Sequence, residues 1–371
     1  MRFADAMKIK LKRAKEFFEL YTSGLNHKEI EQLLKKDTVD AFSYFKKKTS
    51  IADVAPKRPA LRTLLHVSKE IFISFIMQLT PARRLFYGIG IVGFVIGLFK
   101  LDMVYILGSF IILNLLLALE LVDKLTTRDE LEIAREIQMS LQPYELPETR
   151  LLSIATFSKP AKLVGGDFFD IVQPENDRVI SILGDVSDKG ISAALYAVYT
   201  QSMFQSLSES KISASDIMHS LNGLINKRLR EGDFITAVIA LFDLNEKSVT
   251  IARAGHNWPL YYCSSTQTIT ELKPKGLSIG LVENPLFSDR MEEQKIHLNQ
   301  GDFLLLYSDG VTEATNYQNQ LFDVSGLKTV INESIHESSE TIIDRIESRM
   351  QDFVKSNDFQ DDATMIAIKV N

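Results

Sequence analysis

Aspartate residues recur in short turns of this chain, beside segments rich in β-branched and aromatic residues. The four turns are Gly165-Gly166-Asp167, Gly184-Asp185-Val186, Ser308-Asp309-Gly310 and Asp361-Asp362-Ala363-Thr364. Glycine lets the backbone bend sharply and lets a ligand approach closely. Carboxylates that converged at one sheet edge would repel each other unless a cation lay between them, and oxygen ligands select Mg²⁺ or Mn²⁺ over zinc. Each turn by itself is an ordinary structural turn, so the prediction of a metal site depends on the whole set.

The segments that must position these aspartates begin at about residue 151. Strand-like runs bounded by turn residues cover residues 151–158, 168–173, 178–186, 234–243, 248–254, 259–264, 302–310 and 363–370. Helices are predicted at residues 191–208, 214–229 and 339–355, with Ser213 and Asp216 capping the second. Because the strands come in adjacent runs and do not alternate strictly with helices, the pattern predicts antiparallel sheets with helices on their faces, an α+β fold.

Residues 127–141, TRDELEIAREIQMSL, have the pattern of a helix upstream of these strands. Thr127 and Glu130 form a capping box at its start, and Gln142-Pro143 would end it. Its apolar residues make one stripe at Leu131, Ala134 and Leu141, with Ile133 and Ile137 beside it. Two stripes predict a helix that pairs with its copy in a homodimer, packs on the following domain, or does both.

Two apolar stretches precede this helix. Residues 85–99 carry no charge, and residues 103–122 carry one, Glu120. A membrane-spanning helix needs about 20 apolar residues, and arginines at positions 83 and 84 can lengthen the reach of the shorter stretch. With the polar tip at residues 100–102, they predict a two-helix transmembrane hairpin. The alternative is a buried helical hairpin in a soluble protein, although such a helix rarely stays apolar on every side.

Basic residues flank the hairpin on its two long sides. Arg83 and Arg84 precede the first stretch, Lys124 and Arg128 follow the second, and the tip offers only Lys100. The positive-inside rule therefore predicts a two-pass protein of the inner (cytoplasmic) membrane with both flanks in the cytoplasm.

Charge is unevenly spread along the chain. Residues 1–84 contain 18 Lys+Arg and 9 Asp+Glu, whereas the whole chain has a net charge of -6. A basic front and an acidic remainder indicate two regions with different surroundings. The basic front is either attracted to anionic membrane lipid or is an ordinary solvated helical face. The single cysteine, Cys263, excludes a disulfide framework and argues against a cysteine zinc site.

Six segments, taken together and in order, resemble one protein family. They read EIAREIQMSLQP, VGGDFFDI, GDVSDKGISAALYA, AGHNWPLYY, GDFLLLYSDGVTEATN and DDATMIAIKV. They are similar to the metal-dependent Ser/Thr protein phosphatases (PPM, the protein phosphatase 2C type), and most of all to the bacterial SpoIIE and RsbU branch. The resemblance covers roughly residues 129–371 and leaves out the first 84. It implies two antiparallel β-sheets sandwiched between helices, with two divalent ions, Mn²⁺ or Mg²⁺, at one edge.

The resemblance also implies which residues hold those ions. Asp185 would bridge both, helped by the backbone carbonyl of Val186, which stands where the family often has glycine. The remaining ligands would be Asp309 and Asp361 on one ion, with Asp167 contributing directly or through water. Asp361 is preferred to Asp362 because it matches the first residue of the family's Asp-Asn or Asp-Asp pair.

The chemistry that two such ions supply is consistent with the rest of the sequence. Two divalent ions about 3.5–4 Å apart lower the pKa of a bridging water toward ~7 and neutralise charge during in-line attack on a phosphate monoester. No side-chain nucleophile is then needed, and neither a Cys-x5-Arg motif nor a Gly-x-Ser-x-Gly elbow is present. Asp185 and Asp309 are the predicted catalytic residues. His256 is either a general acid or a loop-positioning residue, and Asp170 and Asp188 are predicted to lie outside the ligand set.

The sequence thus predicts four parts. They are a basic helical cytoplasmic region (residues 1–84), the transmembrane hairpin (85–122), a linker or regulatory helix (124–148) and the phosphatase domain (149–371). The predicted function is dephosphorylation of phosphoserine or phosphothreonine on a regulatory protein, which the resemblance suggests is an anti-anti-sigma (STAS-type) factor. Membrane lipid and a second copy of the chain are further expected partners, and no nucleic acid is expected. The alternative is a catalytically inactive scaffold that binds a phosphoprotein at the membrane.

Overall fold

The computed structural model describes residues 69, 72–143, 145–175, 177–210, 213–355 and 359–371. Most of the predicted basic N-terminal region therefore lies outside the described residues. The chain divides into two compact units, Met1–Lys124 and Leu125–Asn371. Each is described by itself below.

A helical hairpin makes up the described part of the first unit. Helix α4 spans Pro81–Lys100 and ends at Leu101, a left-handed residue (φ 51°) that reverses the chain into helix α5, Met103–Ser140. The two helices pack closely at Gly93, which has no side chain. A Cβ there would lie 2.6 Å from the hydroxyl of Ser109. Both helices are long and apolar enough to cross a membrane, and only 11% and 6% of their most apolar windows are buried within the structure. A core helix of a soluble protein would be mostly buried.

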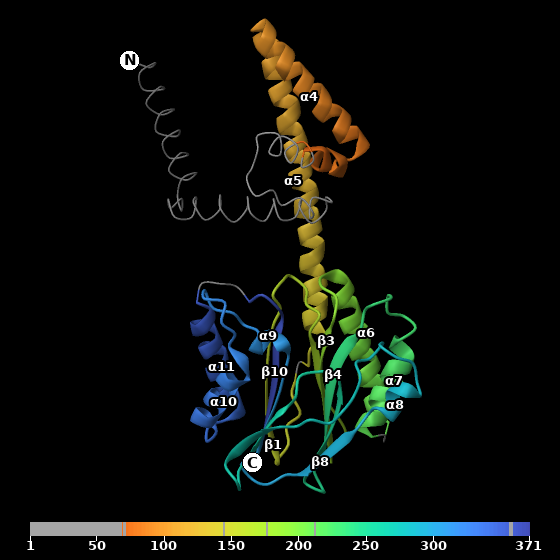
Figure 1. The fold of residues 1–371 in the computed structure, drawn as a ribbon, viewed down its shortest axis with the longest axis vertical. Helices are drawn as coiled ribbons and strands as arrows, with labels where there is room; N and C mark the ends of the chain where they lie inside the picture. The colour runs from red at the N-terminus through yellow and green to blue at the C-terminus, as the bar shows by residue number, and fades with distance from the viewer. Residues whose placement is uncertain (1–68, 70–71, 144, 176, 211–212, 356–358) are drawn as a thin grey trace, which may run out of the picture. The chain divides into compact units, whose positions relative to one another are not determined.

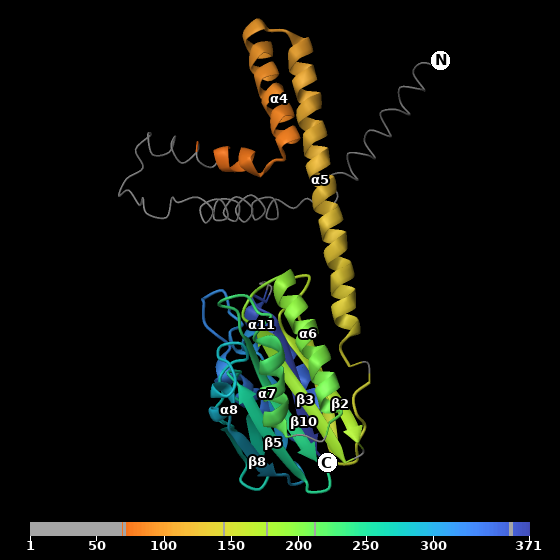
Figure 2. The ribbon, with the colours of Figure 1, turned by 90° about the vertical axis from the view of Figure 1, so that its right-hand side faces the viewer.

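Helix α5 corrects one prediction about the linker. The sequence predicted a new helix with Thr127 as its N-cap, but α5 continues without a break from Met103 to Ser140 (Figures 1 and 2). No proline or glycine interrupts residues 122–127, so the backbone hydrogen bonds of the helix simply continue through them. Its last part, from Leu125, belongs to the second unit.

Two five-stranded antiparallel sheets form the centre of the second unit, as the sequence predicted. The first has the order β1-β10-β9-β6-β7 and the second β2-β3-β4-β5-β8 among the described residues. The strands are β1 (Leu152–Lys159), β2 (Phe168–Glu175), β3 (Arg178–Val186), β4 (Ile235–Asp243), β5 (Ser248–Ala254), β6 (Leu260–Cys263), β7 (Thr268–Glu271), β8 (Glu293–His297), β9 (Phe303–Tyr307) and β10 (Ala363–Val370).

Helices cover the outer faces of both sheets, so the unit has four layers (Figure 1). Helices α9 (Asp309–Thr312), α10 (Asp323–Ser334) and α11 (Ser339–Val354) lie on the side of the first sheet. Helices α6 (Ile191–Ser208), α7 (Ala214–Ile225) and α8 (Leu286–Asp289) lie on the side of the second. One apolar core lies between the sheets and one lies under each helical layer. The predicted capping box of α7, made by Ser213 and Asp216, is confirmed.

The sequence missed the helices α8, α9 and α10 and the strands β7 and β8. The strand predicted at residues 302–310 ends at Tyr307, and Asp309 and Gly310 begin α9 instead. Strands β7 and β8 are edge strands with alternating exposure, and their residues TITE and EQKIH contain few apolar side chains. Helix α10 contains Gly326 and several serine and β-branched residues, which weaken its helical signal. Its burial of Leu327, Val330 and Ile331 against the first sheet decides that it is a helix.

Helix α6 should be held to the second sheet mainly by apolar packing. Phe204 on α6 is fully buried in that layer. We expect Phe204→Ala to lower the free energy of unfolding by about 3–5 kcal/mol, because the substitution removes buried apolar surface and leaves a cavity. Urea unfolding of the full chain, followed by the fluorescence of Trp258, the single tryptophan, measures this loss. The exposed control Ser202→Ala should change it by less than about 0.5 kcal/mol; a similar small change for Phe204→Ala would contradict the packing argument.

Candidate active site

Antiparallel pairing of β9 with β10 brings two of the predicted ligands to one sheet edge. Tyr307 pairs with Met365, so the end of β9 and the beginning of β10 lie side by side. Asp309 follows β9 as the first residue of α9, and Asp361 precedes β10. The close approach requires glycine after Asp309, since a Cβ on Gly310 would lie 2.0 Å from the backbone oxygen of Asp362.

The second sheet brings the other two aspartates together in the same way. Phe168 at the start of β2 pairs with Gly184 near the end of β3, so Asp167 and Asp185 are close. On the other side of β3, Asp185 pairs with Thr236 at the start of β4. The aspartates separated by up to 194 positions in the sequence thus meet because each stands at a strand end.

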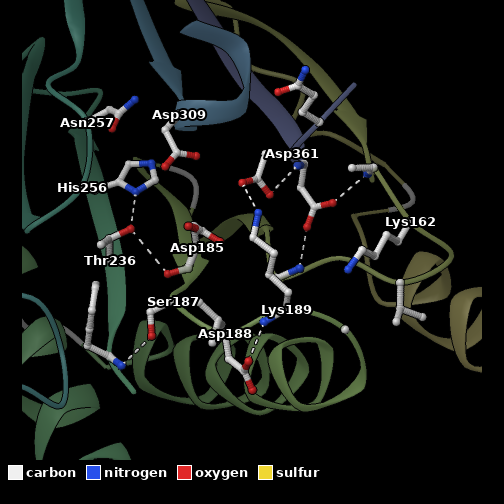
Figure 3. Close-up of a pocket in the computed structure, with 18 of the residues that line it drawn as sticks. Lys162, Asp185, Ser187, Asp188, Lys189, Thr236, His256, Asn257, Asp309 and Asp361 are labelled. Atoms are coloured by element: carbon white, nitrogen blue, oxygen red, sulfur yellow. Dashed lines mark hydrogen bonds and ion pairs between the residues drawn. The ribbon is translucent and has the colours of Figure 1, made fainter. Parts of the chain in front are cut away.

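One pocket collects most of the predicted site. Asp185, Val186, Asp309 and Asp361 all line it, and Figure 3 shows the three carboxylates pointing into the same space. Asp167 does not line this pocket; it borders a small adjoining cavity together with Gly165. The structure therefore brings together four of the five predicted metal ligands and places the fifth directly behind them.

A lysine reaches into this pocket among the carboxylates. The Nζ atom of Lys189 donates to Oδ2 of Asp361 at 2.6 Å (Figure 3). Within the described residues, no three His, Cys, Asp or Glu side chains are gathered closely enough to hold one ion by themselves. In this arrangement the ammonium of Lys189 supplies positive charge next to Asp361. Lys162 lines the same pocket and adds a second positive charge.

Crowding of like charges changes the acidity of the site. Burial, together with the charges of Asp309 and Asp361, raises the pKa of Asp185 to about 7. Burial also raises the pKa of Asp309. The pKa of Asp167 is raised well above its ordinary value by burial and by the charge of Asp185. Groups held in this way are destabilised as anions unless a cation compensates them.

The donor set fits a hard divalent cation. Its members are carboxylate oxygens and the backbone carbonyl of Val186, which are the ligands that Mg²⁺ and Mn²⁺ prefer. The Oδ2 atom of Asp167 is buried and has no hydrogen-bond partner among the described residues. A buried acceptor without a partner carries a desolvation cost that a cation or a bridging water would remove.

The two neighbouring aspartates before β10 have different surroundings. Asp362 accepts hydrogen bonds from the backbone N–H groups of Ala161 and Gly166, both at 2.7 Å, so its two oxygens hold a loop. Asp361 instead points into the pocket toward Lys189 (Figure 3). This geometry favours Asp361 over Asp362 as the ligand.

His256 lies at the pocket beside Thr236. Its Nδ1 lies 2.8 Å from the hydroxyl of Thr236, which in turn donates to the backbone oxygen of Asp185 at 3.4 Å. Which of the two atoms donates in this bond is set by the tautomer of the imidazole. Burial lowers the pKa of His256 to about 3, helped by the charge of Arg253. A neutral imidazole fixed by Thr236 favours the loop-positioning alternative over the general acid.

The two aspartates predicted to lie outside the ligand set have other partners. Asp188 accepts a hydrogen bond from the hydroxyl of Ser192, and its carboxylate is directed away from the other aspartates (Figure 3). Asp170 is buried and accepts from Gln205 at 2.7 Å. Sequence reasoning did not single out Lys189 or Thr236. Lys189 stands inside the motif GDVSDKG, whereas Thr236 has no signal apart from its place at the start of a strand.

Known proteins share both the sequence and the fold. Residues 175–371 match the family described as Stage II sporulation protein E (SpoIIE). The chain is 31% identical over 244 residues to "Phosphoserine phosphatase RsbU" of Bacillus subtilis (strain 168), covering 65% of this chain and 70% of RsbU. The SiaA-PP2C domain of Pseudomonas aeruginosa has a TM-score of 0.57 at 17% identity, covering 67% of this chain and 98% of that domain. The PP2C phosphatase domain of SpoIIE from Bacillus subtilis, with a fragment of its regulatory domain, has a TM-score of 0.52 at 17% identity. The match covers 60% of this chain and 64% of that one.

The fold and the family together define the class of this protein. Two antiparallel sheets between helices are the PP2C fold, and the enzyme is a serine/threonine protein phosphatase, a phosphoric monoester hydrolase. The chain belongs to the SpoIIE family, whose phosphatases depend on metal ions. The family resemblance predicted from the sequence is confirmed.

A positioning role for His256 gives a prediction about pH. We expect His256→Asn, which keeps a donor for Thr236, to retain more activity than His256→Ala. Both should keep the shape of the wild-type pH profile between about pH 6 and 9, because a histidine with a pKa near 3 stays neutral there. Steady-state phosphatase rates on the full chain test this.

Loss of one limb of that profile in both variants would instead identify His256 as a titrating general acid. The pH dependence of the free energy of unfolding independently checks that folding lowers the pKa of His256. Unfolded chain takes up a proton at His256 below pH 6.5 while the folded chain does not, so wild type should lose stability relative to His256→Asn as pH falls from 6.5 toward 4.

Proposed function

We propose that this chain is a membrane-anchored, metal-dependent phosphatase that removes phosphate from phosphoserine or phosphothreonine on a regulatory protein. The observation that carries the proposal is the pocket in which the carboxylates of Asp185, Asp309 and Asp361 converge from separate strand ends. Similarity to RsbU, which is named a phosphoserine phosphatase, supports the substrate class. The proposed substrate is a phosphorylated anti-anti-sigma protein with a STAS-type domain.

The residues around the pocket have distinct proposed roles. Two divalent ions, Mn²⁺ or Mg²⁺, would supply Lewis acidity and an activated water. Asp185 would hold both ions, helped by the Val186 carbonyl. Asp309 and Asp361 would hold one, and Asp167 would contribute directly or through water. Asp185 and Asp309 are thereby the residues that catalysis depends on most.

Lysines at the pocket orient the anionic substrate. Lys162 and Lys189 both line it, and their charges favour the approach of a phosphate group. The ammonium of Lys189 donates to Asp361 at 2.6 Å.

We place the enzyme in the inner (cytoplasmic) membrane as a two-pass protein. The apolar character of α4 and of the first part of α5, together with their low burial, supports membrane insertion. The basic residues at positions 83, 84, 124 and 128 favour a cytoplasmic phosphatase domain. Anionic membrane lipid is a proposed partner of the basic residues 1–84, which lie largely outside the described part of the chain.

Substitution of the bridging aspartate tests the proposed chemistry. The full chain in mild detergent with Mn²⁺ should release phosphate from a phosphoserine protein, and Asp185→Asn should lower kcat by roughly a hundredfold or more because an anionic ligand is lost at the reacting centre. Asp188→Asn is the matched control, since it removes a carboxylate three residues away that points elsewhere, and it should keep activity within a few-fold. Absence of wild-type activity, or equal activity in Asp185→Asn, would instead support the inactive scaffold.

A homodimer through the linker helix is the proposed assembly. In the last part of α5, Ile133 and Ile137 are 58% and 56% exposed, whereas Leu131 and Ala134 on the neighbouring stripe are half-buried. An exposed apolar pair one turn apart is suited to packing against the same pair of a second copy.

We expect Ile133→Asp with Ile137→Asp to convert a dimer into a monomer and to change phosphatase activity. Repulsion and charge burial at a paired helix face are unfavourable. Light scattering with size exclusion in detergent measures the mass of the protein component. The exposed control Glu132→Gln should leave the mass unchanged. A wild-type chain that is already monomeric would refute the dimer.

A further inference from the structure

The last turn of helix α5 is hydrogen-bonded to the backbone of the glycine pair before Asp167. The side-chain amide of Gln138 donates from Nε2 to the carbonyl oxygen of Gly165 at 2.8 Å. Its Oε1 accepts from the N–H of the same residue at 3.2 Å. One side chain thus satisfies both backbone groups of one glycine, which fixes the distance and the orientation of the loop relative to the helix.

The same loop lies directly against the proposed metal ligands. A Cβ on Gly166 would lie 3.2 Å from Oδ1 of Asp185 and 3.2 Å from the carbonyl oxygen of Val186. From the other side, Asp362 accepts from the N–H of Gly166 at 2.7 Å. The glycine pair is therefore held by hydrogen bonds to Gln138 on one side and to Asp362 on the other.

Two further contacts belong to the same region. Gln138 borders the small cavity that also contains Asp167, whose buried Oδ2 lacks a hydrogen-bond partner among the described residues. The side chain of Gln201 on α6 donates to the carbonyl oxygen of Leu141 at 2.7 Å and to that of Phe169 at 3.1 Å. The end of α5 and the residue after it are thus tied to the chain on both sides of Asp167, at Gly165 and at Phe169.

We propose that Gln138 is a positioning residue that sets the metal affinity of the site by holding the Gly165-Gly166 backbone against Asp185 and Val186. The path has three steps: the Gln138 amide fixes Gly165, Gly166 follows through the peptide bond, and Gly166 limits where the Asp185 carboxylate and the Val186 carbonyl can lie. The linker helix therefore acts on the ligands through the loop that precedes Asp167. The inference rests on the proposed function only in taking these groups as metal ligands.

Titration of the full chain with Mn²⁺ in detergent, followed by calorimetry, tests this role. Gln138→Met keeps the length of the side chain but removes both hydrogen bonds, and Gln138→Glu keeps an acceptor but loses the donor to Gly165. Both variants should weaken Mn²⁺ binding by roughly 10–100-fold, the usual effect of losing a group that orients a metal ligand. At saturating Mn²⁺, kcat should return toward the wild-type value with an unchanged KM for substrate.

Ser140→Glu is the matched control, because it adds the same charge to an exposed position on the same turn. It should leave Mn²⁺ affinity within about twofold of wild type, since no metal ligand is reoriented. Thermal unfolding is measured in parallel, because a role limited to anchoring α5 would lower Tm alone. Mn²⁺ affinity unchanged in both Gln138 variants, with or without a lower Tm, would overturn the proposal.

The experiment distinguishes a failure of the proposed role of Gln138 from a failure of the proposed phosphatase function. If the wild-type chain binds Mn²⁺ but releases no phosphate, the phosphatase proposal fails while the affinities still decide the role of Gln138. If Mn²⁺ binding in the wild type does not depend on Asp185, as shown with Asp185→Asn, both fail together.

Discussion

Repulsion between carboxylates held at one edge of two sheets is the constraint on which the rest of this structure depends. Apolar packing between the sheets brings the strand ends together, and burial then raises the pKa of Asp185 to about 7. Such an arrangement is relieved by protonation or by compensating positive charge. Lys189 provides part of it through Asp361, and the family's dependence on metal ions provides the physical reason for keeping the aspartates.

Backbone geometry around the site is as constrained as its charges. Gly310 and Gly166 stand where a Cβ would meet the backbone of Asp362 or the groups around Asp185. Loops without side chains at these points can approach the ligands closely, but they have no packing of their own to hold them. Their positions are therefore decided by hydrogen bonds from outside the loop, and Gln138 is one of the groups that make them.

Uncharged polar contacts support the ligands in the second sheet as well. Thr236 bonds the backbone of Asp185 and is oriented by a buried, neutral His256. The polar groups near the site thus separate into those that face the pocket and those that hold the backbone. Asp361 and Asp362 both line the pocket but have different partners, since the first pairs with Lys189 and the second holds a loop backbone.

Local sequence determined the element types wherever apolar periodicity was strong. The bounds of α6 and β10 agree with the predicted ones, because each run of small or β-branched apolar residues begins sharply after a polar turn. It also determined the family, since the aspartate turns occur in a fixed order. Edge strand β8 and the continuity of α5 through Thr127 escaped prediction, because neither has a strong local pattern.

Only the tertiary structure decided which groups meet. Asp167 and Asp362 have the same chemistry as the other aspartates, yet Asp167 lies behind the pocket and Asp362 holds the loop. In the sequence Gln138 is an ordinary polar residue of a predicted helix, and only the folded structure shows its hydrogen bond to Gly165. The reason is physical: the sequence by itself carries the type of each side chain and its local conformation, whereas distances between strand ends arise from sheet pairing and core packing.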